Sequence, residues 1–362
     1  MVLVILLAIL VAQPAEAATY PITVGFGRSW PLSIVVDSSR GLAYADATSG
    51  IEPPTGFTFG VINVTSHQIS EVLPLDEIPG PMALDQSNGD VFVAGNYSVD
   101  VFDAATQNFS GSIEVGHPIL NIAYDGNISN DIYVAAEDGV YALNPQTSSI
   151  VLNRTVAGGP EGMALDSANG RLFVSEYLAP AILVFQASNL EPIGTIALPN
   201  CCASWLALNP KTQTLYASTG TGYVDMIDAE NSSLDKSVLV TPSAGNSTNA
   251  IAVDDVNDRL YVASSPGGSV LELDGSTGAV LRTLKVQSDS QVAGLAVDTS
   301  TQEVYATNYH MITVFDAAKT RTYLVVIVLA AATVAVVAIL LFLFLRRRDE
   351  KDRMRMQSAG LG

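Results

Sequence analysis

The sequence has few residues of the kinds that usually carry catalysis or bind metals. It contains two cysteines, three histidines and two tryptophans among 362 residues. It also has no H-E-x-x-H, G-x-S-x-G or C-x-x-C-H motif and no phosphate-binding loop. These absences remove the enzyme classes that are recognised by a short local motif.

Basic residues are scarce as well. The chain has 17 Lys and Arg against 36 Asp and Glu, which gives a formal net charge of −19 at pH 7. A strongly acidic protein does not attract nucleic acid or an anionic membrane surface through its overall field. We therefore expect no nucleic-acid partner, and the charge favours either attraction of cations or plain solubility.

What the sequence does have is a repeat. An apolar run ending in Asp or Asn is followed by a polar turn and a second run of the type aliphatic-aromatic-small. The closing Asp or Asn recurs every 40 to 48 residues, near the length of a four-stranded propeller blade. The seven copies end at Asp37, Asp85, Asp125, Asp166, Asn209, Asp254 and Asp298.

The clearest copy, residues 251–286, contains four short apolar runs separated by turns rich in Gly, Pro and Asp. This pattern is typical of an antiparallel meander. A single meander cannot bury both of its faces, so copies must pack on one another. The sequence predicts an all-β, seven-bladed β-propeller with four-stranded blades, whose strands we letter a to d along each blade.

The seventh copy stops one strand short, after Asp316. The segment Pro21–Gly25 resembles the fourth strand of the second blade, around Ile113. We therefore expect the N-terminal strand to complete the last blade and close the ring, which removes its free edges. Pro21 suits the first residue of an outer strand, where a missing N–H is tolerated.

The second runs, such as Leu260-Tyr261-Val262-Ala263, and the Val-Phe-Asp-Ala of blades two and seven resemble the YVTN-type β-propeller repeat. The resemblance covers about residues 20–318 and implies the fold and a place among archaeal and bacterial surface proteins. It implies no particular ligand. The Asn of that repeat is present here only at Asn308; the equivalent places hold Asp46, Gly95, Ala136, Glu176, Thr219 and Ser264.

Two apolar segments flank the repeat. Residues 2–12 are too short to span a bilayer and, with Ala15-Glu16-Ala17, predict a signal peptide over 1–17. Residues 323–345 contain no charge, and basic residues follow. We expect the extracellular propeller over 18–318, a linker at 319–322, one transmembrane helix at 323–345 and a cytoplasmic tail at 346–362. The predicted localisation is the cell membrane.

Seven N-x-S/T sequons become relevant if the chain is exported. We expect glycosylation at some of them: Asn63, Asn96, Asn108, Asn127, Asn153, Asn231 and Asn246.

In a propeller the a–b and c–d turns share one face, the turn face, and the b–c and d–a loops share the other, the loop face. Strand c of blade seven ends close to the predicted span, so we expect the turn face toward the membrane and the loop face outward. Candidate ligand-binding residues lie in the loops of that face: Arg28, Trp30, His117, Glu161, Glu176, Tyr177, Trp205, Asn308, Tyr309 and His310. The structural alternative for both tryptophans is that they cover the hydrophobic rim between blades.

Two further features allow more than one interpretation. Cys201 and Cys202 are adjacent, so they could be free thiols, bridge to a second molecule or form a strained vicinal disulfide. The repeated aspartates Asp85, Asp125, Asp166, Asp254 and Asp298 resemble a carboxylate ring, but their place at strand-to-turn junctions predicts that they bond the backbone of the turn.

The favoured functional hypothesis is a membrane-anchored surface protein whose propeller recognises a protein or glycan. The alternatives are an extracellular hydrolase or lyase with a divalent cation in the outward funnel, and a structural component of the cell envelope. No metal ligands and no other cofactor are assigned from the sequence.

Overall fold

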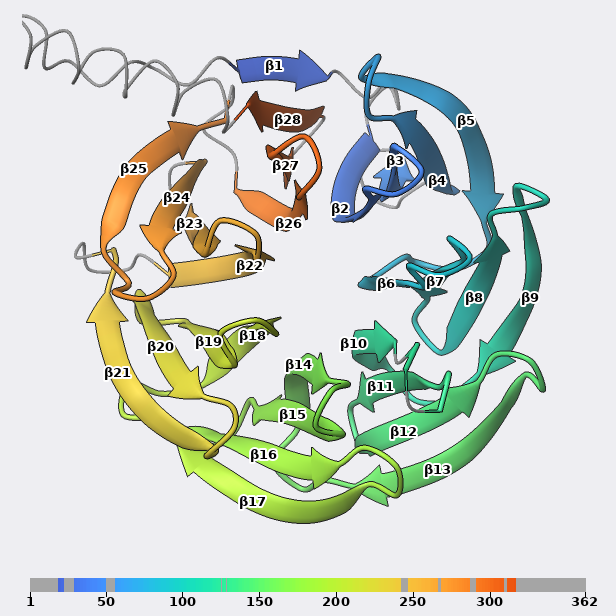
Figure 1. Ribbon diagram of the computed structural model, residues 1–362. Coiled ribbons are helices and arrows are strands. Elements are labelled where there is room, and N and C mark those ends of the chain that lie inside the picture. The colour runs from blue at the N-terminus through green and yellow to red at the C-terminus, as the bar shows by residue number, and fades with distance from the viewer. Residues whose placement is uncertain are drawn as a thin grey trace, which may run out of the picture. The chain divides into compact units, whose positions relative to one another are not determined.

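The chain folds as a ring of seven four-stranded antiparallel sheets in a computed structural model (Figure 1). The structure describes residues 19–22, 29–49, 56–124, 126–127, 129–241, 247–265, 268–286, 291–308 and 311–316. The predicted signal peptide, linker, transmembrane helix and tail lie outside these ranges. The predicted seven-bladed propeller is confirmed.

The blades follow one another along the chain, each with strand a nearest the centre of the ring. Blade one is β2 (Ser29–Asp37), β3 (Leu42–Ser49), β4 (Gly56–Asn63) and β5 (Gln68–Leu75). Blade two is β6 (Met82–Leu84), β7 (Val91–Ala94), β8 (Ser98–Asp103) and β9 (Asn108–Glu114). Blade three is β10 (Ile119–Tyr124), β11 (Ile132–Ala136), β12 (Gly139–Asn144) and β13 (Ser149–Thr155).

The remaining blades repeat the plan. Blade four is β14 (Pro160–Asp166), β15 (Arg171–Glu176), β16 (Ala181–Gln186) and β17 (Glu191–Ala197). Blade five is β18 (Ala203–Asn209), β19 (Thr214–Thr219), β20 (Tyr223–Asp228) and β21 (Ser233–Leu239). Blade six is β22 (Ser247–Asp254), β23 (Arg259–Ser265), β24 (Ser269–Asp274) and β25 (Val280–Lys285).

Blade seven closes the ring with strands from both ends of the repeat. Its inner strands are β26 (Val292–Asp298), β27 (Glu303–Asn308) and β28 (Met311–Asp316), and β1 (Thr19–Ile22) pairs antiparallel with β28. The predicted closure is thus confirmed, although the strand begins two residues earlier than expected. Pro21 stands inside β1 rather than at its start, which is tolerated because β1 is the outer strand.

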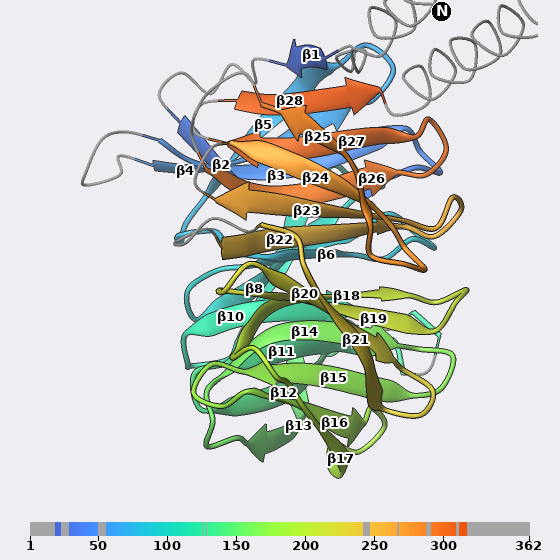
Figure 2. The same ribbon diagram turned by 90° about the vertical axis from the view of Figure 1, so that its left-hand side faces the viewer.

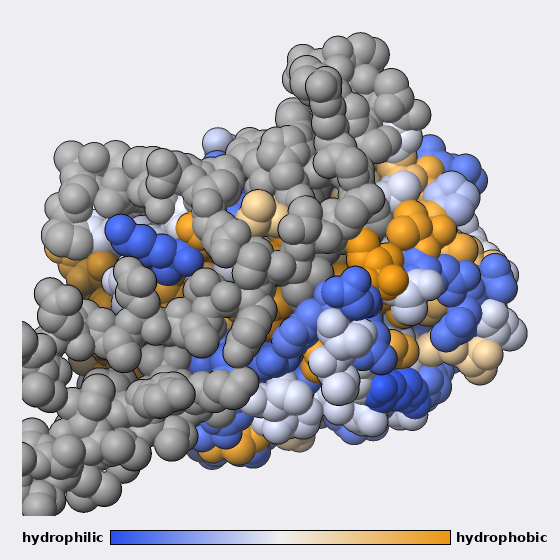
Figure 3. Space-filling model, turned by 90° about the horizontal axis from the view of Figure 1, so that it is seen from above, coloured by the Kyte–Doolittle hydropathy of each residue, from blue (hydrophilic) through white to orange (hydrophobic). Residues whose placement is uncertain are grey.

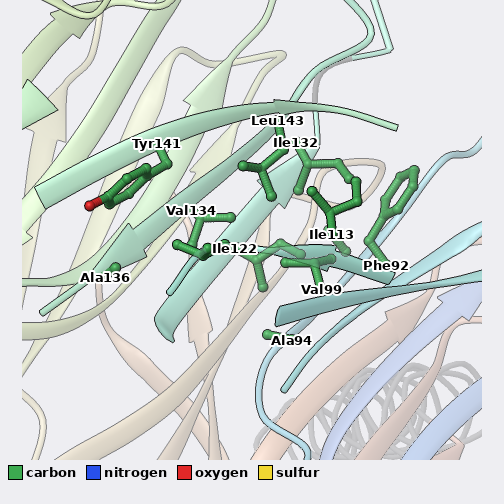
Figure 4. Packing of buried hydrophobic residues seen from close by; sticks show 12 residues of the cluster. Phe92, Ala94, Val99, Ile113, Ile122, Ile132, Val134, Ala136, Tyr141 and Leu143 are labelled. Carbon is green, nitrogen blue, oxygen red and sulfur yellow. The ribbon is translucent and has the colours of Figure 1, made fainter. Parts of the chain in front are cut away.

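The core is a series of clusters between neighbouring blades. Strand b is buried except for half-buried end residues in some blades, whereas strand d alternates or is largely exposed; β11 and β13 illustrate the contrast. Between blades two and three, Phe92 and Ile113 pack against Ile122, Val134 and Leu143 (Figure 4). The side view shows the strands of the blades running roughly along the axis of the ring (Figure 2).

The aromatic residue in the middle of strand b connects one blade to the next. The hydroxyl of Tyr133 donates to the carbonyl of Ala187 at 3.1 Å, and the hydroxyl of Tyr216 donates to the carbonyl of Gly275 at 2.8 Å. Each acceptor lies in the c–d turn of the following blade. The aliphatic-aromatic-small pattern of the repeat therefore has a packing reason: the ring fills the space between blades, and in Tyr133 and Tyr216 the hydroxyl also satisfies a turn carbonyl.

The register of blade one corrects the expected alignment of the repeat. Ile34 of blade one and Leu295 of blade seven occupy equivalent positions in strand a. Ile34 pairs with Ala45 and Leu295 pairs with Ala306, so Ala45 is equivalent to Ala306. The residue that matches Asn308 in blade one is therefore Ala47, and Asp46 matches Thr307. The sequence alignment was wrong by one residue because it relied on spacing from a turn of irregular composition.

Candidate functional site

The two faces of the ring use their polar side chains differently. On the turn face, the repeated aspartates accept hydrogen bonds from the backbone that follows them. Asp85 Oδ1 accepts from the N–H of Ser87 at 2.8 Å, and Asp298 Oδ1 accepts from the N–H of Ser300 at 2.8 Å. Asp166 and Asp254 make the same turn, so the predicted turn role is confirmed for these four; Asp125 lies outside the described residues.

These turn-face carboxylates are occupied by the fold. Burial acts to raise the pKa of Asp85, but hydrogen bonds from Ser87 and Tyr124 outweigh it and hold the pKa below its ordinary value. The same balance lowers the pKa of Asp298, where Ser300 is a main donor. Both carboxylates are buried, and each uses an oxygen to hold its turn, so they do not form an open binding site.

The loop face is different in blade four, where large apolar side chains project into solvent. Tyr177 is 63% exposed and Leu178 is 73% exposed. Their backbone is held: the N–H of Tyr177 donates to the carbonyl of Gly159 at 2.8 Å, and that of Leu178 donates to Gly158 at 3.0 Å. The b–c loop of blade four and the d–a loop that precedes this blade are therefore held together by backbone hydrogen bonds, and both side chains are exposed there.

Gly158 lies in close contact with the Glu176 side chain. A Cβ on Gly158 would overlap the carboxylate of Glu176, the last residue of β15. Glu176 is half-buried, and its side chain lies against Gly158 of the d–a loop. The close approach places a carboxylate beside the two exposed apolar side chains.

Glu161, near the start of β14, is the second carboxylate of this region. Burial raises the pKa of Glu161, against a hydrogen bond from Ser204 that lowers it. Its Oε2 atom is buried and has no hydrogen-bond partner among the described residues. The inner strands of blades four and five approach closely here, since a Cβ on Gly162 would lie 2.8 Å from the carbonyl of Ser204.

The cysteines lie beside Glu161, in the loop between β17 and β18. Their Sγ atoms are 2.9 Å apart, and both are free thiols. Cys201 is exposed and Cys202 is half-buried. The charge of Glu161 is near enough to Cys202 to contribute to the raised pKa of that thiol, after the bond to Cys201 and burial.

Blade three contributes a polar cluster to the same face. His117 lies with Nδ1 3.5 Å from Asp138 Oδ1, and its ring stacks on Tyr141 at 5.9 Å between centroids. The hydroxyl of Tyr141 donates to the carboxylate of Asp138 at 2.9 Å. Burial, and then this bond to Asp138, raises the pKa of Tyr141 to about 12. This cluster can accept or donate hydrogen bonds but contains no activated nucleophile.

The structure places some of the predicted ligand-binding residues on the loop face and others elsewhere. His117, Glu161, Glu176 and Tyr177 all lie on the loop face. Trp205 instead lies within β18 and packs against the hydrophobic cluster between blades five and six. This agrees with the structural alternative, in which the tryptophan covers apolar surface between blades.

Asn308 ends β27 and is buried, with no partner for its amide among the described residues. Trp30 lies in β2, and only its backbone is described. Arg28, Tyr309 and His310 lie outside the described residues.

Several exposed loop-face residues were not among those predicted from the sequence. Exposed large apolar side chains also occur at Ile78, Tyr97 and Leu120, in the loops or strand ends of blades two and three. The signal in the sequence was an aliphatic or aromatic residue within two positions of a loop glycine or proline, but such residues are common in buried positions too. Only the structure shows which of them reach solvent.

The sequons divide between the faces. Asn63, Asn108 and Asn231 lie at c–d turns, Asn127 follows strand a of blade three, and Asn153 lies on an outer strand. All of these except the half-buried Asn63 are exposed. Of the six sequons that the structure describes, only Asn96 belongs to the loop face; Asn246 lies outside the described ranges.

The described ranges hold no group of three or more His, Cys, Asp or Glu side chains arranged to bind a metal ion. Nor do they include a helix long and apolar enough to cross a membrane.

Comparisons with known proteins support the fold. No protein-family model matches the chain. It is 26% identical over 229 residues to proteins named "Uncharacterized protein YncE" from Salmonella typhimurium (strain LT2) and from Salmonella typhi, with 60% of this chain aligned. The alignment spans 62% of those relatives.

A solved structure matches over more of the chain. The β-propeller domain of Cps50 (Swd1) from Myceliophteria thermophila superposes with a TM-score of 0.69, at 9% identity, over 80% of this chain and 96% of that domain. At this identity the likeness shows the fold alone. The chain is a seven-bladed β-propeller.

Proposed function

We propose that this chain is a membrane-anchored cell-surface protein, related to the YVTN-type surface propellers, and that its propeller recognises a protein or glycan through the loop face. A propeller fold is compatible with a binding platform. The export signal, the span at 323–345 and the outward direction of the loop face are sequence arguments within this proposal.

One observation carries the choice of face. Large exposed apolar side chains gather on the loop face of blades two to four: Ile78, Tyr97, Leu120, Tyr177 and Leu178. On the turn face, the described residues include one comparable side chain, Val256, in the a–b turn of blade six. Exposed apolar patches with a polar surround are typical of interaction sites.

Outer strands carry the other exposed apolar residues, as single residues or adjacent pairs spread around the rim. Figure 3, which looks down on that rim, shows hydrophobic and hydrophilic areas mixed over the described surface. Scattered residues of this kind need no functional explanation. The rim therefore offers less support for a binding site than the loop face does.

The residues around these exposed apolar side chains also support a recognition surface on the loop face. The described loops of blades two to five on this face contain the carboxylates of Asp76, Glu77, Glu137 and Asp138 and no Lys or Arg. Most described sequons lie elsewhere, so glycans attached there would leave this face open. Rigid backbone, exposed aromatic and aliphatic side chains and charge of one sign are features of a recognition surface.

The test is retention on glycan and protein arrays. The full-length chain should be retained by a subset of ligands, and Tyr177→Ala combined with Leu178→Ala should weaken that retention at least about tenfold, as for hot-spot residues. Val256→Ala is the matched control, because it removes an equally exposed side chain from the turn face.

The outcomes separate this proposal from its alternatives. Equal loss in the Val256→Ala variant, or retention unaffected by the double variant, would remove the loop face as the binding surface. Ordered lateral assembly of the purified chain, without retention of any ligand, would instead favour a structural component of the cell envelope.

A further inference from the structure

The dipeptide Cys201–Cys202 has a geometry that neither the fold nor the proposed recognition function uses. These are the chain's two cysteines. Their Sγ atoms face each other at 2.9 Å, compared with about 2.05 Å in a disulfide. Closing the bond therefore needs a shift of less than about 1 Å in two side chains of one loop.

The loop is fixed on both sides of the dipeptide. Before it, the side-chain amide of Asn200 donates to Ser237 Oγ at 2.6 Å, and the Asn200 carbonyl accepts from Thr221 Oγ1 at 2.8 Å. After it, Ala203 is fully buried and pairs with Thr219 in the sheet. The backbone thus holds the two thiols together rather than allowing them to separate.

Cys201 also has a backbone conformation that side-chain-bearing residues rarely adopt. Its φ is 72°, in the left-handed region. Strained non-glycine residues of this kind persist where the surrounding structure imposes them, and they cluster at functional sites. The conformation accompanies the approach of the two Sγ atoms.

The two thiols differ in exposure and in the direction of their pKa shift. Cys201 is exposed, and hydrogen bonding from Cys202 lowers the pKa of its thiol. The bond to Cys201, then burial, raises the pKa of Cys202, and the nearby Glu161 adds to this. Because the thiolate is the nucleophile, Cys201 is the attacking group and Cys202 the resolving group.

We propose that Cys201 and Cys202 form a reversible dithiol–disulfide site on the loop face, which small-molecule disulfides oxidise to an intramolecular bond. This goes beyond ligand recognition and does not depend on it. The Cys201 thiolate attacks one sulfur of the small disulfide, forms a mixed disulfide and releases one thiol. Cys202 then loses its proton, attacks the Cys201 sulfur and releases the second thiol.

The step is balanced: the protein loses two protons and two electrons, and the small disulfide takes up both to become two thiols. The bond is reversible because neighbouring Cα atoms lie about 3.8 Å apart, below the usual 4.4–6.8 Å of disulfides. A ring under that constraint is more easily reduced than a structural disulfide. The site therefore responds to the thiol–disulfide balance around it.

The experiment exposes the reduced full-length chain to oxidised glutathione, then alkylates remaining thiols and measures the intact mass. The expected product is a monomer that has lost two hydrogens, carries no alkyl group and regains two alkylatable thiols on treatment with reduced glutathione. No other cysteine pair exists in the chain to give this result.

Two single variants test the assignment of roles. Cys202→Ser keeps a hydroxyl donor beside Cys201 and should accumulate the mixed disulfide at Cys201. Cys201→Ser should form its mixed disulfide at Cys202 several-fold more slowly. Persistent double glutathionylation of the wild type, two thiols that remain alkylatable, or disulfide-linked dimers on a non-reducing gel would each overturn the proposal.

Discussion

The imidazole Nε2 of His67, in the c–d turn of blade one, lies 3.1 Å from Oε2 of Glu303 at the start of β27 in blade seven. The two residues are 236 positions apart. Glu303 also accepts a hydrogen bond from the Tyr305 hydroxyl at 3.0 Å. The contact therefore joins the first and last blades near the place where β1 completes the ring.

Loss of this contact should weaken ring closure. We expect His67→Asn to lower the free energy of unfolding by about 1 kcal/mol, the usual value of a part-buried hydrogen bond. Asn is chosen because it tolerates the positive φ of 54° at this position. Urea unfolding of the two proteins measures the difference, and equal midpoints would show that the contact adds nothing to closure.

Removal of the closing strand should have a larger effect. Deleting residues 19–22 leaves the edge of β28 unpaired, so we expect a loss of about 2–4 kcal/mol, from hydrogen bonds worth about 1 kcal/mol each. Thermal melting and light scattering measure the loss and any aggregation. A truncated protein that melts with the full-length chain would show that closure by β1 is dispensable.

The tyrosines of strand b allow a matched comparison. Tyr216→Phe removes the donor to the Gly275 carbonyl and should cost about 1–3 kcal/mol, because a buried carbonyl is left unpaired. Tyr44 is equally buried, but its hydroxyl has no partner among the described residues. Tyr44→Phe should therefore be neutral or stabilising, and similar losses in both variants would refute the inter-blade role of the hydroxyl.

Asp46 should make stability depend on pH. Its carboxylate is fully buried and accepts from the backbone N–H groups of Leu32 and Ser33. Burial raises its pKa to about 7, above its value of 3.8 without the fold. The folded state thus binds the proton more tightly, so this contribution to stability is complete below about pH 4 and is lost as the pH rises through 7.

The variant Asp46→Asn isolates that effect. An amide oxygen can still accept from Leu32 and Ser33, but it does not titrate. The difference in melting temperature between the variant and the wild type should therefore grow in favour of the variant between pH 4 and pH 8. A difference that is constant with pH would mean that Asp46 does not titrate in this range.

A metal-dependent enzyme would behave differently from the proposed platform. We expect thermal melts of the full-length chain to superimpose in EDTA and in added Ca²⁺. A ligand that binds the folded state raises the melting temperature by mass action. A reproducible rise with Ca²⁺ would favour the alternative hydrolase or lyase with a cation in the funnel.

The repeat itself was determined by the sequence. Apolar runs, turn residues and a period of 40 to 48 residues specify four-stranded blades, because each strand is encoded locally by its alternation and its flanking turns. The roles of Asp85 and Asp298 could be predicted for the same reason, since an Asx turn involves residues two or three positions apart.

The tertiary structure decided what depends on distant residues. Trp205 and Tyr177 are both large aromatic residues beside a loop, yet one packs between blades and the other projects into solvent. The register of blade one and the contact of His67 with Glu303 likewise depend on partners that local pattern does not specify. Exposure and pairing are properties of the closed ring, so only the arrangement of all seven blades could fix them.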